Sequence, residues 1–432
     1  MNGLKLGITF CILSLISVTG FAEQIRANVA AVILTPPLEI GYTLGGYGAR
    51  MSKPAVGIHD NIKAKALVVE KDNKKYAIIT LDILGLPPNV KPQVIERLNK
   101  KDWTEENIMF LPSHSHTSLE MFALNDKNIF GMPQIGIFQP ELLEFVVHTL
   151  TELIVLADQD LQPVKIGTNR KQIEGMNRNR RGEPYVDKYL TVTRVDYLDG
   201  TPMTVMVNWT GHPTIMDDDD MLVSGGWPGY LQRELEAWIG NDVVAMYFNG
   251  AEGDQSVVGE SISGSHYEKA ENYGRSLAIK ALGIYNSIAI TNNVNFNYTL
   301  QIVQLPTRKA HPDFMETGGE EYGLNEENIQ TLLNQVFPEK TTIGSCRIGD
   351  LLIVGVPGEL TSELGLQIKE ELYSQGIKYP VIGGLANQWI SYIMSEEAYM
   401  KSGYEASVSF YGKDLGNVIV KEAISTAEKL IK

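Results

Sequence analysis

The sequence predicts an α/β protein in which a mixed β-sheet core is flanked by helices within a single large domain. Short apolar runs rich in β-branched residues alternate with stretches of helical periodicity along the chain. The 432 residues, 44% hydrophobic and 21% charged, are enough to bury a large core. No internal repeat or low-complexity linker divides the chain, so one domain is expected.

The predicted strands are apolar runs that end at glycine, proline or polar residues. They cover residues 65–71, 76–83, 107–111, 190–198, 204–209, 243–248, 347–356 and 379–385.

The predicted helices show apolar residues at the spacing of one helix face. The last of them has Thr361 or Ser362 as a start signal and Gly376 as a stop signal. They cover residues 140–157, 228–239, 267–285 and 361–376.

Residues 1–22 have the layout of a secretory signal peptide, with Lys5 before an apolar stretch and small residues up to Ala22. The apolar stretch is shorter than the ~20 residues that span a bilayer, so it does not suit a membrane anchor. A secreted or periplasmic protein is therefore expected. Only Cys346 then remains after cleavage, which excludes an internal disulfide and a structural cysteine-zinc site.

The formal net charge of −15 disfavours nucleic acid as a partner, because nucleic acid attracts basic surfaces. For the same reason, we expect at most peripheral contact with an anionic membrane.

Polar side chains gather just beyond five of the predicted strands. Such loops meet at one edge of a sheet, which predicts a single concave site there. The residues, in chain order, are His114 and His116, then His212, then Asp254 and Ser256, then Glu359, then Asn387 and Tyr392.

Two or three histidines with a carboxylate form a ligand set suited to catalytic zinc. Each member also has an ordinary interpretation: the two histidines of "HSH" as polar loop residues, His212 as a turn residue, and Glu359 as a carboxylate at a helix start. The acidic run 217–220 could hold calcium, although a solvated loop suits it better. The chain lacks both H-E-x-x-H and G-x-S-x-G, which disfavours a helix-borne zinc protease and a serine hydrolase.

Several segments in succession resemble the neutral/alkaline non-lysosomal ceramidase family. They are "FLPSHSHTS", "NRNRRGEP", "VNWTGHPTIM", "LVSGGWPGY", "FNGAEGDQS", "VPGEL" and "GLANQWISYIMSEEAYMKSGYEAS". The resemblance covers nearly all of residues 23–432, which are therefore expected to form a zinc hydrolase domain. The chain ends at Lys432, where the family continues into an immunoglobulin-like domain, so that domain is expected to be missing.

The resemblance also implies roles for individual residues. Zinc would be held by two histidines, a glutamate and a tyrosine, and an N-acyl amide would be cleaved by attack of zinc-bound water. The implied zinc ligands are His114, His212, Glu359 and Tyr392, with His116 as the proton-transfer histidine, Arg178 as a substrate-binding arginine, Tyr404 polarising the amide carbonyl, and Asp254 and Ser256 lining the site.

The chain departs from the family pattern at "GDQSVV" and at Gly226, where the family has aspartate.

The favoured function is hydrolysis of ceramide or a related N-acyl sphingolipid. The alternatives are a carbohydrate-directed or other hydrolase on the same metal scaffold, and a non-catalytic binding protein. A narrow apolar pocket would favour an acyl chain, and aromatic platforms with many polar groups would favour a sugar.

The segment 121–138 has two possible roles. We expect its apolar residues either to form an apolar lip at the site or simply to pack in the core. These residues are Phe122, Phe130, Met132, Ile135 and Phe138.

Overall fold

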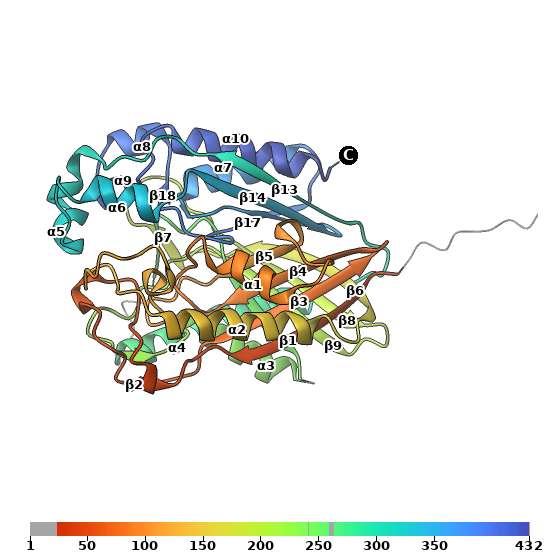
Figure 1. Cartoon of the computed structure of the whole chain (residues 1–432). Coiled ribbons are helices and arrows are strands. Elements are labelled where there is room, and N and C mark those ends of the chain that lie inside the picture. The colour runs from red at the N-terminus through yellow and green to blue at the C-terminus, as the bar shows by residue number, and fades with distance from the viewer. Residues whose placement is uncertain (1–23, 241, 259–262, 432) are drawn as a thin grey trace, which may run out of the picture.

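The computed structural model of the chain describes residues 24–240, 242–258 and 263–431. The predicted signal peptide, residues 1–22, lies outside the described residues. Two β-sheets pack face to face, and helices cover the outer face of each, so that four layers are stacked (Figure 1). The predicted class, a mixed sheet flanked by helices, is confirmed, and the strands are divided between two sheets.

The larger sheet has eight strands in the order β11-β9-β8-β6-β1-β3-β4-β5. Only the pairs β11–β9 and β4–β5 are parallel, which makes the sheet mixed. The strands are β1 (Arg26–Ile33), β3 (Lys63–Lys71), β4 (Lys74–Leu81), β5 (Ile108–Pro112), β6 (Gln162–Gln172), β8 (Tyr189–Tyr197), β9 (Pro202–Trp209) and β11 (Val244–Asn249).

The smaller sheet has four strands, β13 (Phe296–Gln304), β14 (Lys340–Ile348), β15 (Leu351–Gly355) and β17 (Tyr379–Gly383). The single strand predicted at 347–356 was wrong, because the chain turns at Gly349, which has φ 61°, and β14 and β15 pair antiparallel across this turn. Three two-stranded pairs lie outside the main sheets: β2 (Gly57–Ile58) with β10 (Leu222–Val223), β7 (Asn177–Asn179) with β12 (Gln255–Val257), and β16 (Glu359–Leu360) with β18 (Tyr392–Ile393).

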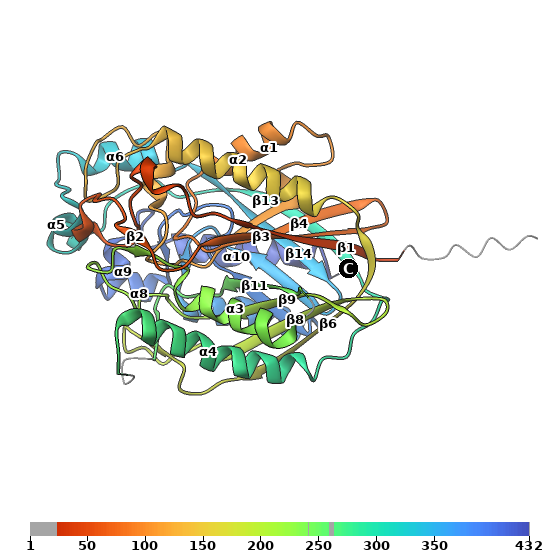
Figure 2. The same cartoon turned by 90° about the horizontal axis from the view of Figure 1, so that it is seen from below.

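The helices cover the two outer faces. Seen from below, α1 and α2 cover one half of the large sheet and α3 and α4 the other, while α7 and α10 cover the small sheet (Figures 1 and 2). The α-helices are α1 (Val90–Leu98), α2 (Pro140–Ala157), α3 (Gly226–Ile239), α4 (His266–Tyr285), α5 (Gly318–Tyr322), α6 (Ile329–Val336), α7 (Ser362–Ser374), α8 (Glu396–Met400), α9 (Tyr404–Ser407) and α10 (Leu415–Glu428). Short 3₁₀ turns are η1 (Leu38–Ile40), η2 (Gly48–Arg50), η3 (Glu105–Asn107), η4 (Met121–Leu124) and η5 (Pro312–Glu316).

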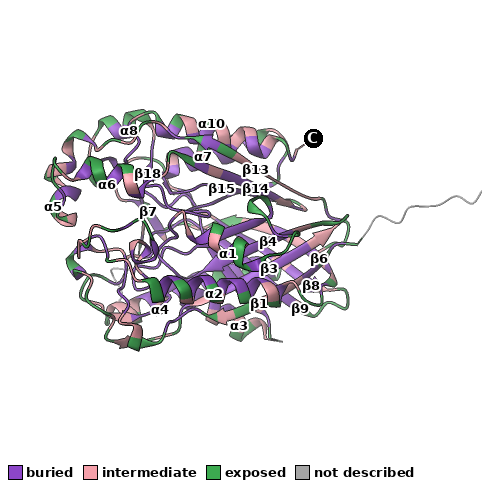
Figure 3. Cartoon of the chain, viewed as in Figure 1, coloured by how far each residue is buried: buried purple, intermediate pink, exposed green. Residues whose placement is uncertain are grey.

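A dry core holds the two sheets together. Ile78 and Met109 of the large sheet meet Ile353 and Val381 of the small sheet, and all four are buried. Each fully buried aliphatic side chain contributes roughly 1.5–3 kcal/mol, so this layer is a major source of stability. Cys346 lies in the same layer as a buried free thiol and packs as a small apolar residue. Figure 3 shows the strands as mainly buried, with the exposed residues gathered on helices and loops.

In the described part of the chain, no helix combines the length and the apolar character that crossing a bilayer requires.

Candidate metal centre

The loops that follow β5, β9 and β15 bring three of the predicted residues to one place. His114 follows β5, His212 follows β9 and Glu359 follows β15. Their side chains are buried, with at most 4% of each exposed. The parallel pairing of β16 with β18 adds a fourth residue, because it sets Glu359 directly opposite Tyr392. Strands of both sheets therefore contribute to the site.

His114 is held in one orientation by its backbone and by one ring nitrogen. Its φ of 68° is left-handed, a conformation that costs a non-glycine residue roughly 1–2 kcal/mol. Nδ1 donates to the carbonyl of Leu84 at 2.6 Å. This bond directs Nε2 into the site, where it lies 3.3 Å from Oε2 of Glu359. A carbonyl behind one ring nitrogen is the usual support for a metal-binding histidine.

His212 completes a cluster of three histidines. Its Nε2 lies 3.1 Å from Nε2 of His116 and 3.9 Å from Oε2 of Glu359. One ring nitrogen from each of His114, His116 and His212 lies within 4.8 Å of the others. Burial, followed by the charge of Arg180, lowers the pKa of His212 well below its usual range. The ring is therefore neutral at physiological pH and has a lone pair for a metal.

The imidazole ring of His116 packs directly against Gly46. Any other residue at position 46 would displace this ring. Gly46 has φ +96°, and a Cβ there would lie 2.3 Å from Nδ1 of His116. Nδ1 itself has no hydrogen-bond partner among the described residues. The buried Arg50 donates to the carbonyl of His116, which fixes this part of the loop. Burial lowers the pKa of His116 well below its usual range, so this ring is also neutral.

Glu359 offers one oxygen to the cluster and holds the other in a hydrogen bond. Oε1 accepts from the indole N–H of Trp389 at 2.7 Å, whereas Oε2 has no hydrogen-bond partner among the described residues. Burial alone would raise the pKa of Glu359, but the neighbouring His114 and the hydrogen bond from Trp389 act against burial, and the pKa is lowered. The group is thus a carboxylate with one free oxygen.

The donor set fits a zinc ion. Ligand atoms at about 2.0–2.1 Å from one tetrahedral zinc lie about 3.4 Å from one another. The 3.3 Å and 3.9 Å contacts from Glu359 to His114 and His212 are near that spacing. The free Oε2 of Glu359 points at the same position. His116 is as close to His212 as a ligand would be, so its predicted place outside the metal ligands stays a prediction.

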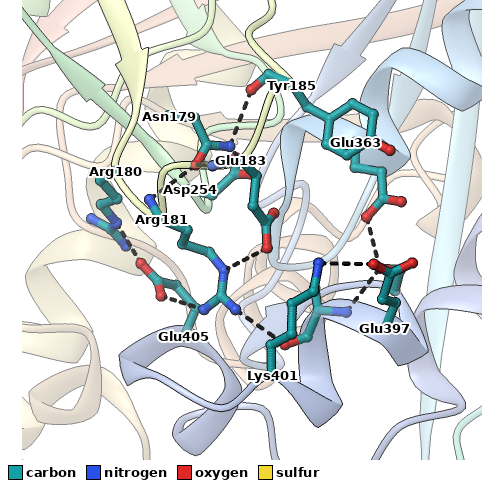
Figure 4. Close-up of polar contacts among 12 residues, drawn as sticks. Asn179, Arg180, Arg181, Glu183, Tyr185, Asp254, Glu363, Glu397, Lys401 and Glu405 are labelled. Carbon is teal, nitrogen blue, oxygen red and sulfur yellow. Dashed lines mark hydrogen bonds and ion pairs between the residues drawn. The ribbon is translucent and has the colours of Figure 1, made fainter.

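An arginine in the turn directly after β7 reaches Tyr392. Arg180 donates to Oη of Tyr392 at 3.0 Å and to Glu405 at 2.6 Å. Arg181 donates to the other oxygen of Glu405 at 2.8 Å, so this carboxylate lies between the two guanidinium groups (Figure 4). Glu405 is only 5% exposed, which makes these charge-assisted bonds effective. They hold Arg180 in its position beside Tyr392.

The predicted substrate-binding arginine, Arg178, lies two residues before Arg180. It is exposed and sits in β7 opposite Ser256 of β12. The arginine in contact with Tyr392 is therefore Arg180, and the role predicted for Arg178 stays a prediction.

Asp254 and Ser256 lie on the segment that leads away from His212. Asp254 is buried and accepts from the backbone N–H of Ser362 at 2.8 Å and from Asn179 at 2.7 Å. It thereby ties the first turn of α7 to the end of β7, directly before Arg180; Asp254, Asn179 and Arg180 are labelled in Figure 4. Ser256 forms an isolated parallel bridge with His212. The lining role predicted for both residues stays a prediction.

The histidine cluster opens into a pocket, and His114, His116, Glu359 and Tyr392 all line it. Tyr404 lies at its polar end, where its hydroxyl contacts that of Tyr322 at 2.8 Å and its ring lies 6.0 Å from that of Tyr392. The rest of the wall includes the polar residues Tyr47, Glu120 and Gln134. Its apolar residues are more numerous and are Leu84, Met121, Phe122, Ile135, Leu324, Leu332, Phe337, Trp389, Val408 and Phe410.

The predicted apolar lip is divided between the pocket and the core. Phe122 and Ile135 line the pocket. Phe130 and Met132 pack against the core beneath the small sheet, and Phe138 packs against the core under α2. Both interpretations of this segment are thus correct for different residues.

Several residues at the site were not singled out from the sequence. Trp389 holds Glu359, Tyr322 contacts Tyr404, and Arg180 contacts Tyr392. Glu252 is fully buried beside His212, and burial, together with the charge of Glu359, raises its pKa well above the usual range. For Arg180, Glu252 and Trp389, the sequence signal was their place near predicted residues, within "NRNRR", "NGAEGD" and "ANQWISY". Tyr322 had no such signal.

Glu120, on the pocket wall, gives a pH-dependent prediction. Burial raises its pKa to about 7, against the opposing effect of backbone N–H groups. The Glu120 carboxyl stays protonated to a higher pH in the folded state than in the unfolded chain. Its contribution to the free energy of unfolding therefore falls as pH rises from about 4.5 to about 7. Relative to Glu120→Gln, the wild-type protein is expected to lose about 1–3 kcal/mol of unfolding free energy between about pH 5 and about pH 8. Urea unfolding at both pH values measures this, and a pH-independent difference would contradict it.

Comparison with known proteins identifies relatives of the chain. The family described as "Neutral/alkaline non-lysosomal ceramidase, N-terminal" matches residues 34–272 and 324–420. Neutral ceramidase A of Dictyostelium discoideum is 20% identical over 492 aligned residues, covering 87% of this chain and 68% of that protein. The neutral ceramidase of Pseudomonas aeruginosa is 22% identical over 491 aligned residues, covering 93% of this chain and 72% of that protein.

Solved structures give the same fold. The crystal structure of neutral ceramidase from Pseudomonas aeruginosa superposes with a TM-score of 0.80 at 20% identity, covering 95% of this chain and 75% of that one. A structure described as "Ceramidase complexed with C2" superposes with a TM-score of 0.79 at 20% identity, covering 94% and 75%.

Proposed function

Because the chain belongs to the neutral/alkaline non-lysosomal ceramidase family, we propose that it is a zinc-dependent hydrolase that cleaves the N-acyl amide of ceramide or a related N-acyl lipid. The observation that supports this most directly is a buried cluster of metal-binding groups at the polar end of an otherwise apolar pocket. An acyl chain suits such walls, whereas a sugar would need many polar partners.

We also propose that residues 1–22 direct export of the protein. N-terminal sequencing of the exported protein would test this.

We propose that His114, His212, Glu359 and Tyr392 hold the zinc. The free Oε2 of Glu359 and the inward ring nitrogens of the two histidines support this set. A bound zinc ion polarises a carbonyl group and lowers the pKa of water to about 7. The Leu84 carbonyl and the Trp389 indole keep His114 and Glu359 in place before the metal arrives.

The other side chains of the pocket bind and orient the substrate and move the proton. His116 is neutral, faces His212 and lines the pocket, so its ring can take a proton from the attacking water. The hydroxyl of Tyr404 can donate to the oxygen of the amide as negative charge develops on it. Arg180, held by Glu405, keeps Tyr392 oriented and adds positive charge near the reacting amide.

Two measurements test the proposal together. The purified protein should contain zinc, and it should hydrolyse a short-chain N-acyl sphingosine dispersed in detergent micelles. A chelator should remove both the metal and the activity, and added zinc should restore them. Bound zinc without cleavage of any N-acyl amide would overturn the proposed reaction, and full activity of the metal-free protein would overturn the proposed cofactor.

Arginine substitutions test which guanidinium serves the site. Arg180→Met is expected to lower zinc affinity or kcat/KM by about 10–100-fold, because supporting contacts to metal ligands typically contribute that much. Arg178→Met is the matched control, two residues earlier in the chain and with the same loss of charge, and should change either quantity by less than about threefold. Zinc titration against a chromophoric chelator and steady-state kinetics measure the two effects. A larger loss in Arg178→Met would return the role to Arg178.

A further inference from the structure

Three aromatic rings lie together in the wall of the pocket. Phe122 comes from η4, Phe337 follows α6 directly, and Trp389 lies in the loop after β17. The ring centroids are 6.3 Å apart for Phe122 and Phe337, 5.8 Å for Phe122 and Trp389, and 5.6 Å for Phe337 and Trp389. Each ring therefore contacts the other two, and the three form what we call the ring floor.

Further space lies on the other side of the ring floor. A narrow space, which we call the rear cavity, is lined by all three rings together with Leu86, Pro87 and Val336. A surface groove lies next to it and shares Pro88, Val336 and Phe337 with it. The rings therefore lie between the pocket on one side and the rear cavity and the groove on the other.

Phe337 is the ring that separates these spaces. It lines the pocket, the rear cavity and the groove, which neither of the other two rings does. Trp389 is fixed by its hydrogen bond to Glu359 at 2.7 Å, and the backbone of Phe122 is fixed by its N–H bond to Glu120 at 3.0 Å. The ring of Phe337 is 3% exposed and is held by packing alone.

We infer that the ring floor sets the length of the acyl chain, with Phe337 as the specificity-determining residue that separates the acyl site from the rear cavity and the groove. This inference rests on the proposed function. Each methylene buried in an apolar pocket strengthens binding by about fourfold, so affinity rises with chain length until the chain reaches the floor. A longer chain must leave methylenes in water or displace Phe337, and it gains nothing further.

Shortening Phe337 tests the inference. In Phe337→Ala the pocket joins the rear cavity, so the ratio of kcat/KM for octadecanoyl to hexanoyl sphingosine is expected to rise by at least about 10-fold, as for two methylenes newly buried. Phe314→Ala is the matched control, because Phe314 is fully buried in the same core but does not line the pocket. Its ratio should equal that of the wild type. An unchanged ratio in Phe337→Ala would overturn the inference.

A binding measurement separates this inference from the proposed function. Saturated fatty acids from hexanoic to octadecanoic acid are titrated into the wild-type protein, Phe337→Ala and Phe337→Leu. The leucine substitution is milder, so it still tests the inference if the alanine variant fails to fold. Affinity should stop rising at a shorter chain in the wild type than in the variants. If no amide is cleaved but this shift appears, the proposed reaction fails and the ring floor stands. If all three proteins show the same dependence on chain length, or bind no fatty acid, the ring floor is overturned.

Discussion

Replacement of His114 by alanine is expected to release the metal and to lower kcat/KM for amide hydrolysis by about 10⁴-fold or more. His114 is the histidine closest to the free oxygen of Glu359, at 3.3 Å, and the Leu84 carbonyl orients its ring before any metal binds. Without it, the remaining groups cannot surround an ion. Elemental analysis of the dialysed protein and steady-state kinetics on a micellar N-acyl sphingosine measure the two losses.

The matched control for this variant is His148→Ala. His148 lies on an exposed part of α2, so its loss removes an imidazole without touching the pocket. That variant should keep zinc and activity within about twofold of the wild type, as surface substitutions usually do. If His114→Ala retains one zinc per chain and hydrolyses the amide, His114 is not a metal ligand.

Replacement of His116 by alanine is expected to preserve the metal and to lower kcat by about 10²–10⁴-fold, the usual contribution of a positioned proton-transfer group. The ring lines the pocket and faces His212, whereas Glu359 contacts His114 and His212. Zinc content and kcat are measured on the same preparation, and the pH dependence of kcat should lose the limb that reports the missing base.

The contrast between the two variants decides between two ligand sets that the geometry offers. If His116→Ala loses zinc as completely as His114→Ala, the metal is bound by the three histidines, whose ring nitrogens all lie within 4.8 Å. If zinc remains, the set with Glu359 and Tyr392 is supported and His116 acts on the proton.

The elements that the sequence predicted best depend on local interactions. The helix predicted at 140–157 has those bounds in the structure, because Pro140 occupies its first turn and one face repeats apolar residues along its length. Strand β5 was likewise predicted within one residue at each end, since a short apolar run before a proline has few other uses. β1, β6 and β13 were not predicted, because many of their residues are polar or only partly buried and their apolar pattern is weak.

By itself the sequence determined the fold class and placed His114, His212, Glu359 and Tyr392 in loops at strand ends, because periodicity and turn signals act over a few residues. Only the tertiary structure decided that the strands form two sheets, that Arg180 contacts Tyr392, and that His116 is as close to His212 as a ligand would be. Those outcomes depend on pairing and packing between segments distant in sequence. A buried strand carries the same apolar pattern whichever sheet it joins. Two arginines two residues apart in the sequence look alike until their neighbours are in place.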